Sequence, residues 1–270
     1  MITILGSSGY IGSSLLNNFN KKSIPTFAPD RDKNLFNHDL GDVIYCIGMT
    51  ADFRLKPFET VESHVSILND LLKNGKFDSL TYLSSSRVYI GSSENVVDEN
   101  SNIVISINDP DSLYNLTKLT GERICLSSGR NTKIIRLSNI YGDNYDSPNF
   151  IFELIKKIKE NKFIELYTSL NSSKDYLSID LAVKLITQIA LGKTNGIFNL
   201  ASGNNISNKE IIDMLNAHFD FKYNFNQKSK EVIYPQININ KIKKEFNFKS
   251  EETKDNLLKL IKKSKNDTNR

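Results

Sequence analysis

The chain has 270 residues, of which 39% are hydrophobic and 24% charged, and its formal net charge is +4 at pH 7. This length fits one large α/β domain, or a domain with a small cap, and it can bury a full core. The lysines are dispersed rather than gathered in a stripe, which argues against a nucleic-acid partner.

Segments for export or membrane insertion are not expected. The sequence has no apolar run long enough to cross a bilayer, and the first predicted strand already begins at Ile2. The two cysteines, Cys46 and Cys125, fall on an apolar strand and an apolar helical stripe, without paired spacing or metal-ligating neighbours. We therefore expect buried, reduced thiols, no metal site, and a cytoplasmic protein with no membrane partner.

Strands alternate with helices along the first half of the chain, which predicts a parallel sheet with helices on both faces. The expected strands are 2–5, 26–29, 43–47, 80–84 and 133–137, and the expected helices are 11–20, 59–73 and 112–127. Beyond Arg136 the pattern changes to a long helix at 149–159, short strands, and helices at 179–190 and 208–219. We expect a doubly wound α/β fold of the Rossmann type, with a dinucleotide-binding domain at 1–138. Residues 139–270 should form mainly a substrate-binding cap, packed with the first domain as one compact unit because later strands should join the sheet.

A glycine turn directly follows the first strand, with Gly6, Gly9 and Gly12 spaced as GxxGxxG. Gly6 permits a tight turn, Gly9 lets a pyrophosphate approach the main chain, and Gly12 lets the next helix pack against the sheet. The free N–H groups and the dipole of that helix bind phosphate without a basic side chain. A simple tight turn is the alternative, and the amphipathic helix that follows makes it less favoured. The residues expected to contact a dinucleotide here are Gly6, Ser8, Gly9, Tyr10, Ile11 and Gly12.

Tyr114 and Lys118 form a YxxxK pair on a predicted helix. Residues four apart share a helix face, so the ammonium should lie beside the phenol and favour its deprotonated form. An unperturbed tyrosine titrates near pH ~10 and is a poor base at neutrality. A solvated helix face is the alternative for so common a spacing. The glycine turn upstream favours a tyrosine acid/base beside a nicotinamide.

Six sequence blocks occur in an order that resembles a known family: GSSGYIG at 6–12, LSSSRVYIG at 83–91, SLYNLTK at 112–118, RLSNIYG at 136–142, KDYLSID at 174–180 and IFNLASG at 197–203. They resemble the extended short-chain dehydrogenase/reductases, and among these the NAD-dependent epimerase/dehydratase branch of nucleotide-sugar epimerases, dehydratases and 4-ketoreductases. The resemblance spans nearly the whole chain. It implies a nicotinamide cofactor, NADP(H) or NAD(H), and a nucleotide-diphosphate sugar as substrate.

The resemblance places the catalytic hydroxyl three residues before Val88, at Ser85. Ser84 and Ser86 remain alternatives, because side chains alternate at a strand end and a shift of one residue points the wrong hydroxyl at the substrate. Ser85 would hydrogen-bond the sugar carbonyl or alkoxide while Tyr114 exchanges the proton. In the same scheme Lys118 holds the nicotinamide ribose and tunes Tyr114.

The same blocks indicate the reaction type and the sugar pocket. Dehydratases of this family carry an Asp-Glu pair where this chain has Ser86 and Arg87. We therefore expect oxidation or reduction at C4 rather than dehydration. Ser86 and Tyr89 are expected to line the pocket, and Asn139 and Lys174 to lie near the diphosphate. Lys174 replaces the family's Arg, which keeps the charge and loses bidentate geometry; an exposed loop lysine is the alternative.

Two departures from the family pattern concern the cofactor side. Family members usually have a helix between the Asp-Leu that touches adenine and the next strand, whereas Asp39-Leu40 runs straight into a strand here. An edge helix is therefore expected to be missing, which would leave the adenine pocket more open; Asp39 as a turn residue is the alternative. Ile47 and Gly48 are expected at the cofactor. His64 replaces a helix Asn, and it either hydrogen-bonds similarly or has no role.

We expect a 4-keto-sugar reductase, with a 4-epimerase or a non-catalytic dinucleotide sensor as alternatives. Asp30 and Arg31 follow the second strand, where an acid binds the ribose hydroxyls of NAD and a base accommodates the phosphate of NADP. This segment resembles that of GDP-fucose-type reductases and favours NADPH. A homodimer is expected through apolar positions on the helices at 59–73 and 112–127. These positions are Val61, Val65, Leu68, Leu72, Leu116, Leu119 and Cys125.

Overall fold

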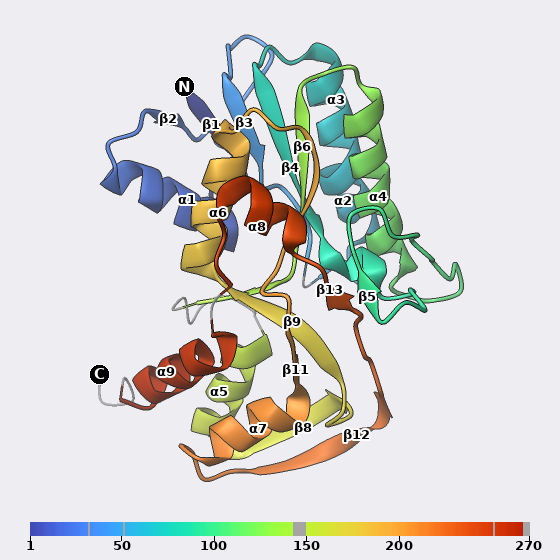
Figure 1. Ribbon diagram of the computed structural model, residues 1–270, viewed down its shortest axis with the longest axis vertical. Coiled ribbons are helices and arrows are strands. Elements are labelled where there is room, and N and C mark those ends of the chain that lie inside the picture. The colour runs from blue at the N-terminus through green and yellow to red at the C-terminus, as the bar shows by residue number, and fades with distance from the viewer. Residues whose placement is uncertain (32, 51, 143–149, 251, 267–270) are drawn as a thin grey trace.

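Six parallel strands form the central sheet of the computed structural model, which describes residues 1–31, 33–50, 52–142, 150–250 and 252–266 (Figure 1). Their order across the sheet is β10-β6-β4-β3-β1-β2. The strands are β1 (Ile2–Leu5), β2 (Thr26–Phe27), β3 (Asp42–Tyr45), β4 (Ser79–Ser85), β6 (Thr132–Leu137) and β10 (Gly196–Leu200). Every residue of β1 and β6 is buried, as in a parallel sheet covered on both faces. The predicted doubly wound α/β sheet is therefore confirmed.

Helices cover both faces of this sheet (Figure 1). One face carries α1 (Tyr10–Lys21), α6 (Ile179–Leu191) and α8 (Asn240–Phe246). The other carries α4 (Ser112–Ser127) and a long helix composed of α2 (Pro57–Val61), a π-helical turn η1 (Glu62–Ser66) and α3 (Ile67–Asn74). Leu15 and Ile186 belong to the core on the first face, and Leu71 and Tyr82 to the core on the second.

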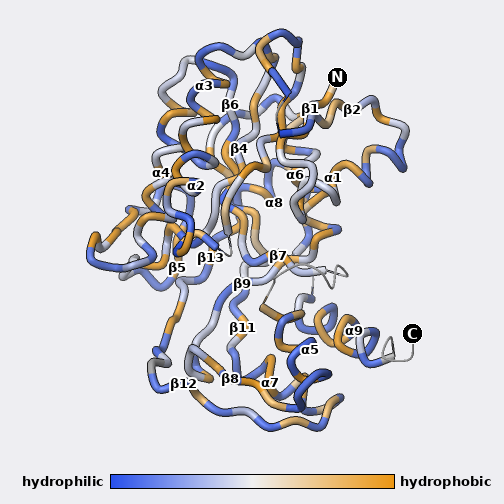
Figure 2. The backbone as a smooth tube through the Cα atoms, turned by 180° about the vertical axis from the view of Figure 1, so that it is seen from behind, coloured by the Kyte–Doolittle hydropathy of each residue, from blue (hydrophilic) through white to orange (hydrophobic). Residues whose placement is uncertain are grey.

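A smaller cap lies beyond the carboxyl ends of the strands. It contains α5 (Phe150–Asn161), β8 (Phe163–Thr168), β9 (Ser173–Ser178), β11 (Asn205–Ser207), α7 (Asn208–Asn216), β12 (Lys222–Lys230) and α9 (Thr253–Asn266), with β7 (Asn139–Tyr141) leading into it. Helices α5, α7 and α9 share one core with β8, in which Ile155, Ile164, Leu215 and Leu257 are buried. Helices α1 and α5 alternate apolar and polar stretches, as expected of helices with one buried face (Figure 2).

The chain crosses between the two parts several times. After the first cap elements it returns to the sheet, where β10 pairs with β6 in parallel, and it returns once more when β13 (Gln236–Ile237) pairs with β5 (Val96–Val97). The change of role near residue 139 is therefore not a simple division into two successive units. The second return also brings Tyr234, which precedes β13, to Arg87 just beyond the carboxyl end of β4.

The segment between β2 and β3 contains no helix among its described residues, as the sequence indicated. Leu40 is completely buried there, its N–H donates to the Lys76 carbonyl at 2.9 Å, and its carbonyl accepts from Thr3 Oγ1 at 2.6 Å. The prediction that Leu40 binds the cofactor is therefore wrong: without an edge helix the chain turns directly into the sheet and carries Leu40 into the core. Asp39 accepts the Gly41 N–H at 3.2 Å, with Gly41 at φ +57°, so it acts as a turn residue.

The predicted dimer face is partly turned inward. Leu68, Leu72 and Cys125 are buried against the sheet, because they lie on the inner sides of α3 and α4. The large apolar side chains left exposed on or beside α2 and α4 are Leu55, Phe58, Val61, Leu116 and Leu126, of which Leu55 and Phe58 are 84% and 85% exposed. The outward apolar face of this layer is therefore nearer to the amino-terminal end of α2 than the sequence indicated.

Candidate functional site

The glycine turn between β1 and α1 has the geometry of a backbone phosphate cradle. Gly6 has φ +85°, and a Cβ atom there would lie 2.9 Å from the Cys46 carbonyl carbon. A Cβ on Gly12 would lie 2.2 Å from the Gly6 oxygen, so the first turn of α1 packs directly on the loop. Gly9 is the N-cap of α1, and no side chain caps the helix. The first N–H groups of α1 therefore lack a side-chain acceptor, which fits an anion at this position.

Of the three serines at the end of β4, Ser85 is the one that meets Tyr114. Ser84 is buried, and its hydroxyl donates to Glu122 Oε1 at 2.5 Å. Ser85 hydrogen-bonds the Tyr114 phenol and accepts the backbone N–H of Arg87 at 3.2 Å. Ser86 is buried at the start of a 3-10 turn, η2 (Ser86–Tyr89). The structure therefore brings together the pair expected for polarising a carbonyl and moving its proton.

Tyr114 lies in the first turn of α4 and is only 6% exposed. Burial raises the pKa of its phenol, while the hydrogen bond with Ser85 and the charge of Arg87 lower it. Its ring packs against Phe53 at a centroid distance of 5.1 Å and against His64 at 5.3 Å. The phenol is therefore held in one orientation and protonated at neutral pH.

Lys118 is one helical turn beyond Tyr114 and is buried. Its Nζ donates to the Leu83 carbonyl at 2.9 Å and would lie 3.3 Å from a Cβ atom on Gly48. Burial lowers the pKa of Lys118 to about 7, while Glu122 and Cys46 raise it. The charge that lowers the pKa of Tyr114 in this structure is that of Arg87, and the tuning of Tyr114 by Lys118 stays a prediction. The place of Lys118 beside Gly48 fits a grip on a ribose.

His64 connects three parts of the site and is completely buried in η1. Its Nε2 accepts the Met49 N–H at 3.1 Å, and its Nδ1 lies 2.8 Å from Thr117 Oγ1. Because Nε2 accepts, the ring proton belongs on Nδ1, where it is donated to the Thr117 hydroxyl. The histidine thus holds the loop after β3 against α4. Of the two predictions made for His64, the structure fits the hydrogen-bonding one.

Arg87 is the site residue that sequence reasoning missed. It forms an ion pair with Asp111, and its Nη1 donates to the Tyr234 hydroxyl at 3.2 Å. Asp111 also binds Arg54 through two contacts of 2.5 Å each, and both guanidinium groups lie near the Phe53 ring. The available signal for Arg87 was its position two residues after Ser85. From the sequence, that position was interpreted only as lacking the acid of the dehydratases. Tyr234 gave no signal, because it arrives from the cap.

Tyr89 does not line the pocket, so that prediction is wrong. It is 1% exposed, its hydroxyl donates toward Asn199 Oδ1 at 2.8 Å, and it accepts from Arg136 Nη1 at 2.7 Å. Arg136 in turn forms a buried ion pair with Glu122 at 2.7 Å. The cause is η2: the chain leaves the extended conformation after Ser85, so side-chain alternation along the strand no longer applies.

The predicted diphosphate residues lie on neighbouring strands. Asn139 on β7 is paired in register with Tyr176 on β9, and its Nδ2 donates to the Asp175 carbonyl at 2.9 Å. Lys174 Nζ lies 4.7 Å from the Phe150 ring centroid, at the described start of α5; residue 149, the predicted start of that helix, lies outside the described residues. Burial, and then Arg87, lower the pKa of Lys174 to about 8. Lys174 is thus a half-buried residue of β9 rather than an exposed loop lysine.

The adenosine end of the site is open. Asp30 and Arg31 are exposed after β2, Asp39 is also exposed, and Ile47 is half-buried directly after β3.

In the described part of the chain, no group of three or more His, Cys, Asp or Glu side chains is placed to hold a metal ion. None of the helices described has both the length and the apolar character required to cross a membrane.

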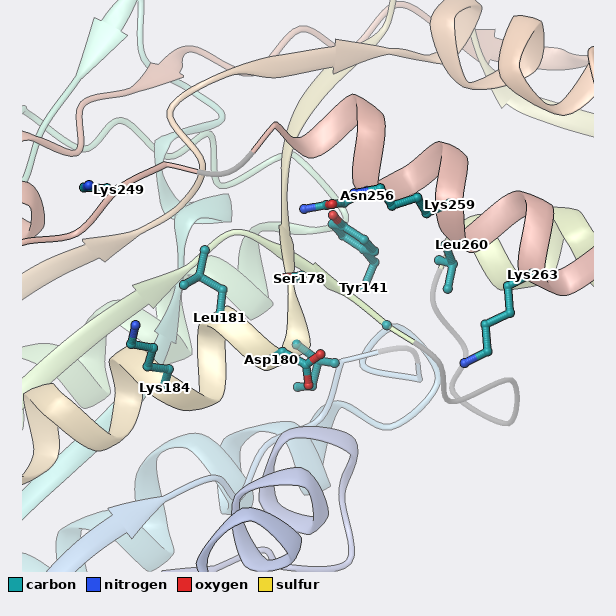
Figure 3. A pocket seen from close by; sticks show the side chains of 12 residues that line it. Tyr141, Ser178, Asp180, Leu181, Lys184, Lys249, Asn256, Lys259, Leu260 and Lys263 are labelled. Carbon is teal, nitrogen blue, oxygen red and sulfur yellow. The ribbon is translucent and has the colours of Figure 1, made fainter.

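A separate pocket of about 620 Å³ lies between α6 and α9 (Figure 3). Lysines from α6, from the segment after α8 and from α9 line it, together with Asp180. These lysines are Lys184, Lys249, Lys259 and Lys263. Its lining does not include Ser85, Tyr114 or Lys118, so we do not assign it to their chemistry.

The described residues fit a nicotinamide dinucleotide. The glycine turn and the uncapped start of α1 suit the pyrophosphate, and the room beside Gly48 and Lys118 suits the nicotinamide ribose. Tyr114 and Ser85 lie at the carboxyl end of β4, the edge of an open α/β sheet at which ligands bind. A sugar bound between the sheet and the cap would meet these hydroxyls and the cations Arg87 and Lys174.

Known proteins are similar to this chain in sequence or in fold. The chain is 25% identical over 238 residues to a Bacillus subtilis (strain 168) protein described as an uncharacterized UDP-glucose epimerase, YtcB, which covers 71% of this chain and 72% of that protein. The structure of MoeE5 in complex with UDP-glucuronic acid and NAD superposes with a TM-score of 0.81 at 18% identity, over 97% of this chain and 99% of that one. RMD from Pseudomonas aeruginosa, complexed with NADPH, has a TM-score of 0.76 at 18% identity, over 98% and 99%. Residues 54–201 match the family model described as the NAD dependent epimerase/dehydratase family, and the chain belongs to that family.

Proposed function

We propose that this protein transfers a hydride between a nicotinamide dinucleotide and C4 of a nucleotide-diphosphate sugar, acting as a 4-keto-sugar reductase. The observation that carries the proposal is the meeting of Ser85 and Tyr114 at the end of β4, with Lys118 one helical turn away. A non-catalytic sensor on this fold has no need for all three side chains.

The residues of this chain have separate roles in the proposed reaction. The nicotinamide, when bound, supplies the hydride. Tyr114 supplies the proton: burial raises the pKa of its phenol, so the group is protonated at neutral pH and can donate to the oxygen that forms as the ketone is reduced. Ser85 donates a hydrogen bond to the same oxygen. Lys118 holds the ribose, and His64 fixes the loop that carries Gly48 by binding the Met49 N–H.

The open adenosine end supports a reductase over an epimerase. A reductase exchanges its dinucleotide in every turnover, whereas an epimerase can retain it. Asp30, Arg31 and Asp39 are exposed, and no helix covers the described residues between β2 and β3. Arg31 also supplies a positive charge for the 2′-phosphate of NADPH. A 4-epimerase is the second candidate, because the Bacillus subtilis relative is described as an epimerase.

The test begins with the cofactor content of the purified protein and a set of nucleotide 4-keto sugars followed at the nicotinamide absorbance. We expect little retained cofactor and a preference for NADPH, which Arg31→Ala should reduce about 5- to 150-fold relative to NADH. Two results together would identify an epimerase: NAD that stays tightly bound during purification, and no preference for NADPH that Arg31→Ala could reduce.

Tyr114→Phe tests the proton donor. It should lower turnover about 100- to 10,000-fold and leave cofactor binding nearly unchanged, because only the acid/base hydroxyl is lost. Tyr234→Phe is the matched control, since it removes a neighbouring hydroxyl to which no proton transfer is assigned. Near-normal turnover in Tyr114→Phe would exclude Tyr114 from the mechanism.

A further inference from the structure

Arg87 is fixed at the reacting end of the site. Its backbone N–H donates to Ser85 Oγ at 3.2 Å, and its guanidinium is paired with Asp111. Asp111 is the N-cap of α4, three residues before Tyr114, so this ion pair places the guanidinium beside the phenol. Tyr234 holds the other side of the group at 3.2 Å. The positive charge therefore lies next to the two hydroxyls that handle the sugar oxygen.

Among the described residues, two cations share the carboxylate of Asp111, namely Arg54 and Arg87. Arg54 already binds both oxygens of that carboxylate at 2.5 Å each, and the Arg54 side chain is 54% exposed to solvent. Arg87 is only 23% exposed. A partly buried guanidinium that shares its carboxylate partner with a second arginine provides a site for an anion.

Arg87 also has an unused donor. Its Nε is buried and has no hydrogen-bond partner among the described residues. A buried guanidinium normally satisfies its N–H groups, and charged acceptors match its planar fork best. This donor therefore indicates an acceptor that arrives with the ligand.

We propose that Arg87 selects a sugar that carries a carboxylate next to the reacting carbon, so that the preferred substrates are nucleotide-diphosphate hexuronates. This inference rests on the function proposed above and adds the chemical class of the sugar. In such a sugar the C6 carboxylate is attached to C5, the neighbour of C4. An oxygen at C4 held by Ser85 and Tyr114 leaves that carboxylate within reach of a group two residues from Ser85.

The diphosphate does not explain Arg87 equally well. Lys174 and Asn139 lie on β9 and β7, beside Phe150 at the start of α5, and they are the residues placed for the phosphates. Arg87 comes instead from the end of the strand that carries Ser85. A substrate with a diphosphate at one end and a carboxylate at the other would therefore bind Lys174 through the diphosphate and Arg87 through the carboxylate.

The experiment compares nucleotide sugars that differ only at C6. Calorimetry measures their binding to protein saturated with the reduced cofactor, so that no hydride can leave the sugar. The pairs are UDP-glucuronate with UDP-glucose and GDP-mannuronate with GDP-mannose. We expect the acidic member of at least one pair to bind more than tenfold tighter.

Variants assign the preference to Arg87. Arg87→Gln should remove it by weakening the acidic ligand at least tenfold and the neutral ligand less than threefold, and Arg87→Lys should keep part of it. Arg54→Gln is the matched control, because it loses the exposed partner of the same Asp111 and should keep the preference. Cofactor binding in each variant verifies the fold.

Two results would overturn this inference while leaving the proposed function intact. One is equal affinity for both members of each pair that binds, and the other is Arg87→Gln weakening both members to the same extent. If no nucleotide sugar binds to protein that does bind the cofactor, the proposed function fails, and the inference fails with it.

Discussion

Replacing His64 by Asn should make the protein less sensitive to acid. The imidazole is completely buried, and both of its nitrogens are in hydrogen bonds, with the Met49 N–H and the Thr117 hydroxyl. A second ring proton has no acceptor in this arrangement. Burial, and then the charge of Lys118, lower the pKa of His64 to about 2 from an ordinary value of 6.5.

The expected effect follows from proton linkage. Below pH 6.5 the unfolded chain binds a proton at this histidine, whereas the folded protein stays neutral down to about pH 2. The contribution of His64 to stability is therefore complete above pH 6.5 and is lost as the pH falls. The loss is about 1.4 kcal/mol per pH unit, or about 2 kcal/mol between pH ~7.5 and pH ~5.

Urea unfolding of the wild type and of His64→Asn over this pH range measures the difference. Asn cannot titrate but retains an oxygen that can accept the Met49 N–H, so it is a closer match than Ala. The variant should be less stable at pH ~7.5 by about 1–3 kcal/mol, for the lost contacts. Its stability should then fall by about 2 kcal/mol less than that of the wild type on acidification. Parallel pH curves for the two proteins would refute a buried neutral His64.

Two further changes test the site and the assembly. Lys118→Met should weaken cofactor binding and lower turnover together, because its Nζ lies beside Gly48 at the ribose position; a cofactor titration with initial rates measures both, and unchanged affinity would contradict the assignment. Phe58→Glu should convert the expected homodimer into monomers, because Phe58 is 85% exposed on the outward face of α2. Light scattering measures the mass, and Phe163→Glu on β8 should leave it unchanged. A monomeric wild type at micromolar concentration would exclude the dimer.

The sequence could predict those parts of the site whose geometry depends on neighbouring residues or on a residue's place along one strand or helix. The glycine turn depends on backbone contacts within a few residues, apart from the approach of Gly6 to Cys46. The meeting of Ser85 with Tyr114 also followed from a parallel sheet, because the end of β4 and the start of α4 lie at the same edge. Position along an element was sufficient for these residues.

The rest depended on contacts between distant segments. Arg87 reaches Tyr234 across 147 positions, and no periodicity in either segment indicates that contact. Leu40 was misassigned because its contact with adenine was inferred from a family whose members have an edge helix at this place. Among the described residues of this chain the helix is missing, and Leu40 lies in the core instead of in a loop. In both cases the surroundings of the side chain depend on a segment that is distant in the sequence, Tyr234 for Arg87 and Lys76 for Leu40.

A buried ion pair determines which serine of the run meets Tyr114. Ser84 donates to Glu122, which is held by Arg136 from β6, and Arg136 also donates to Tyr89. Removing Ser84 from this network would leave a buried carboxylate with one fewer donor, so a shift of one residue in β4 is costly. Ser84 is fixed against Glu122 of α4, and Ser85, the last residue of β4, meets Tyr114 in the first turn of the same helix. The buried network that holds Tyr89 away from the proposed pocket is thus also the one that fixes the position of Ser85 at the end of β4.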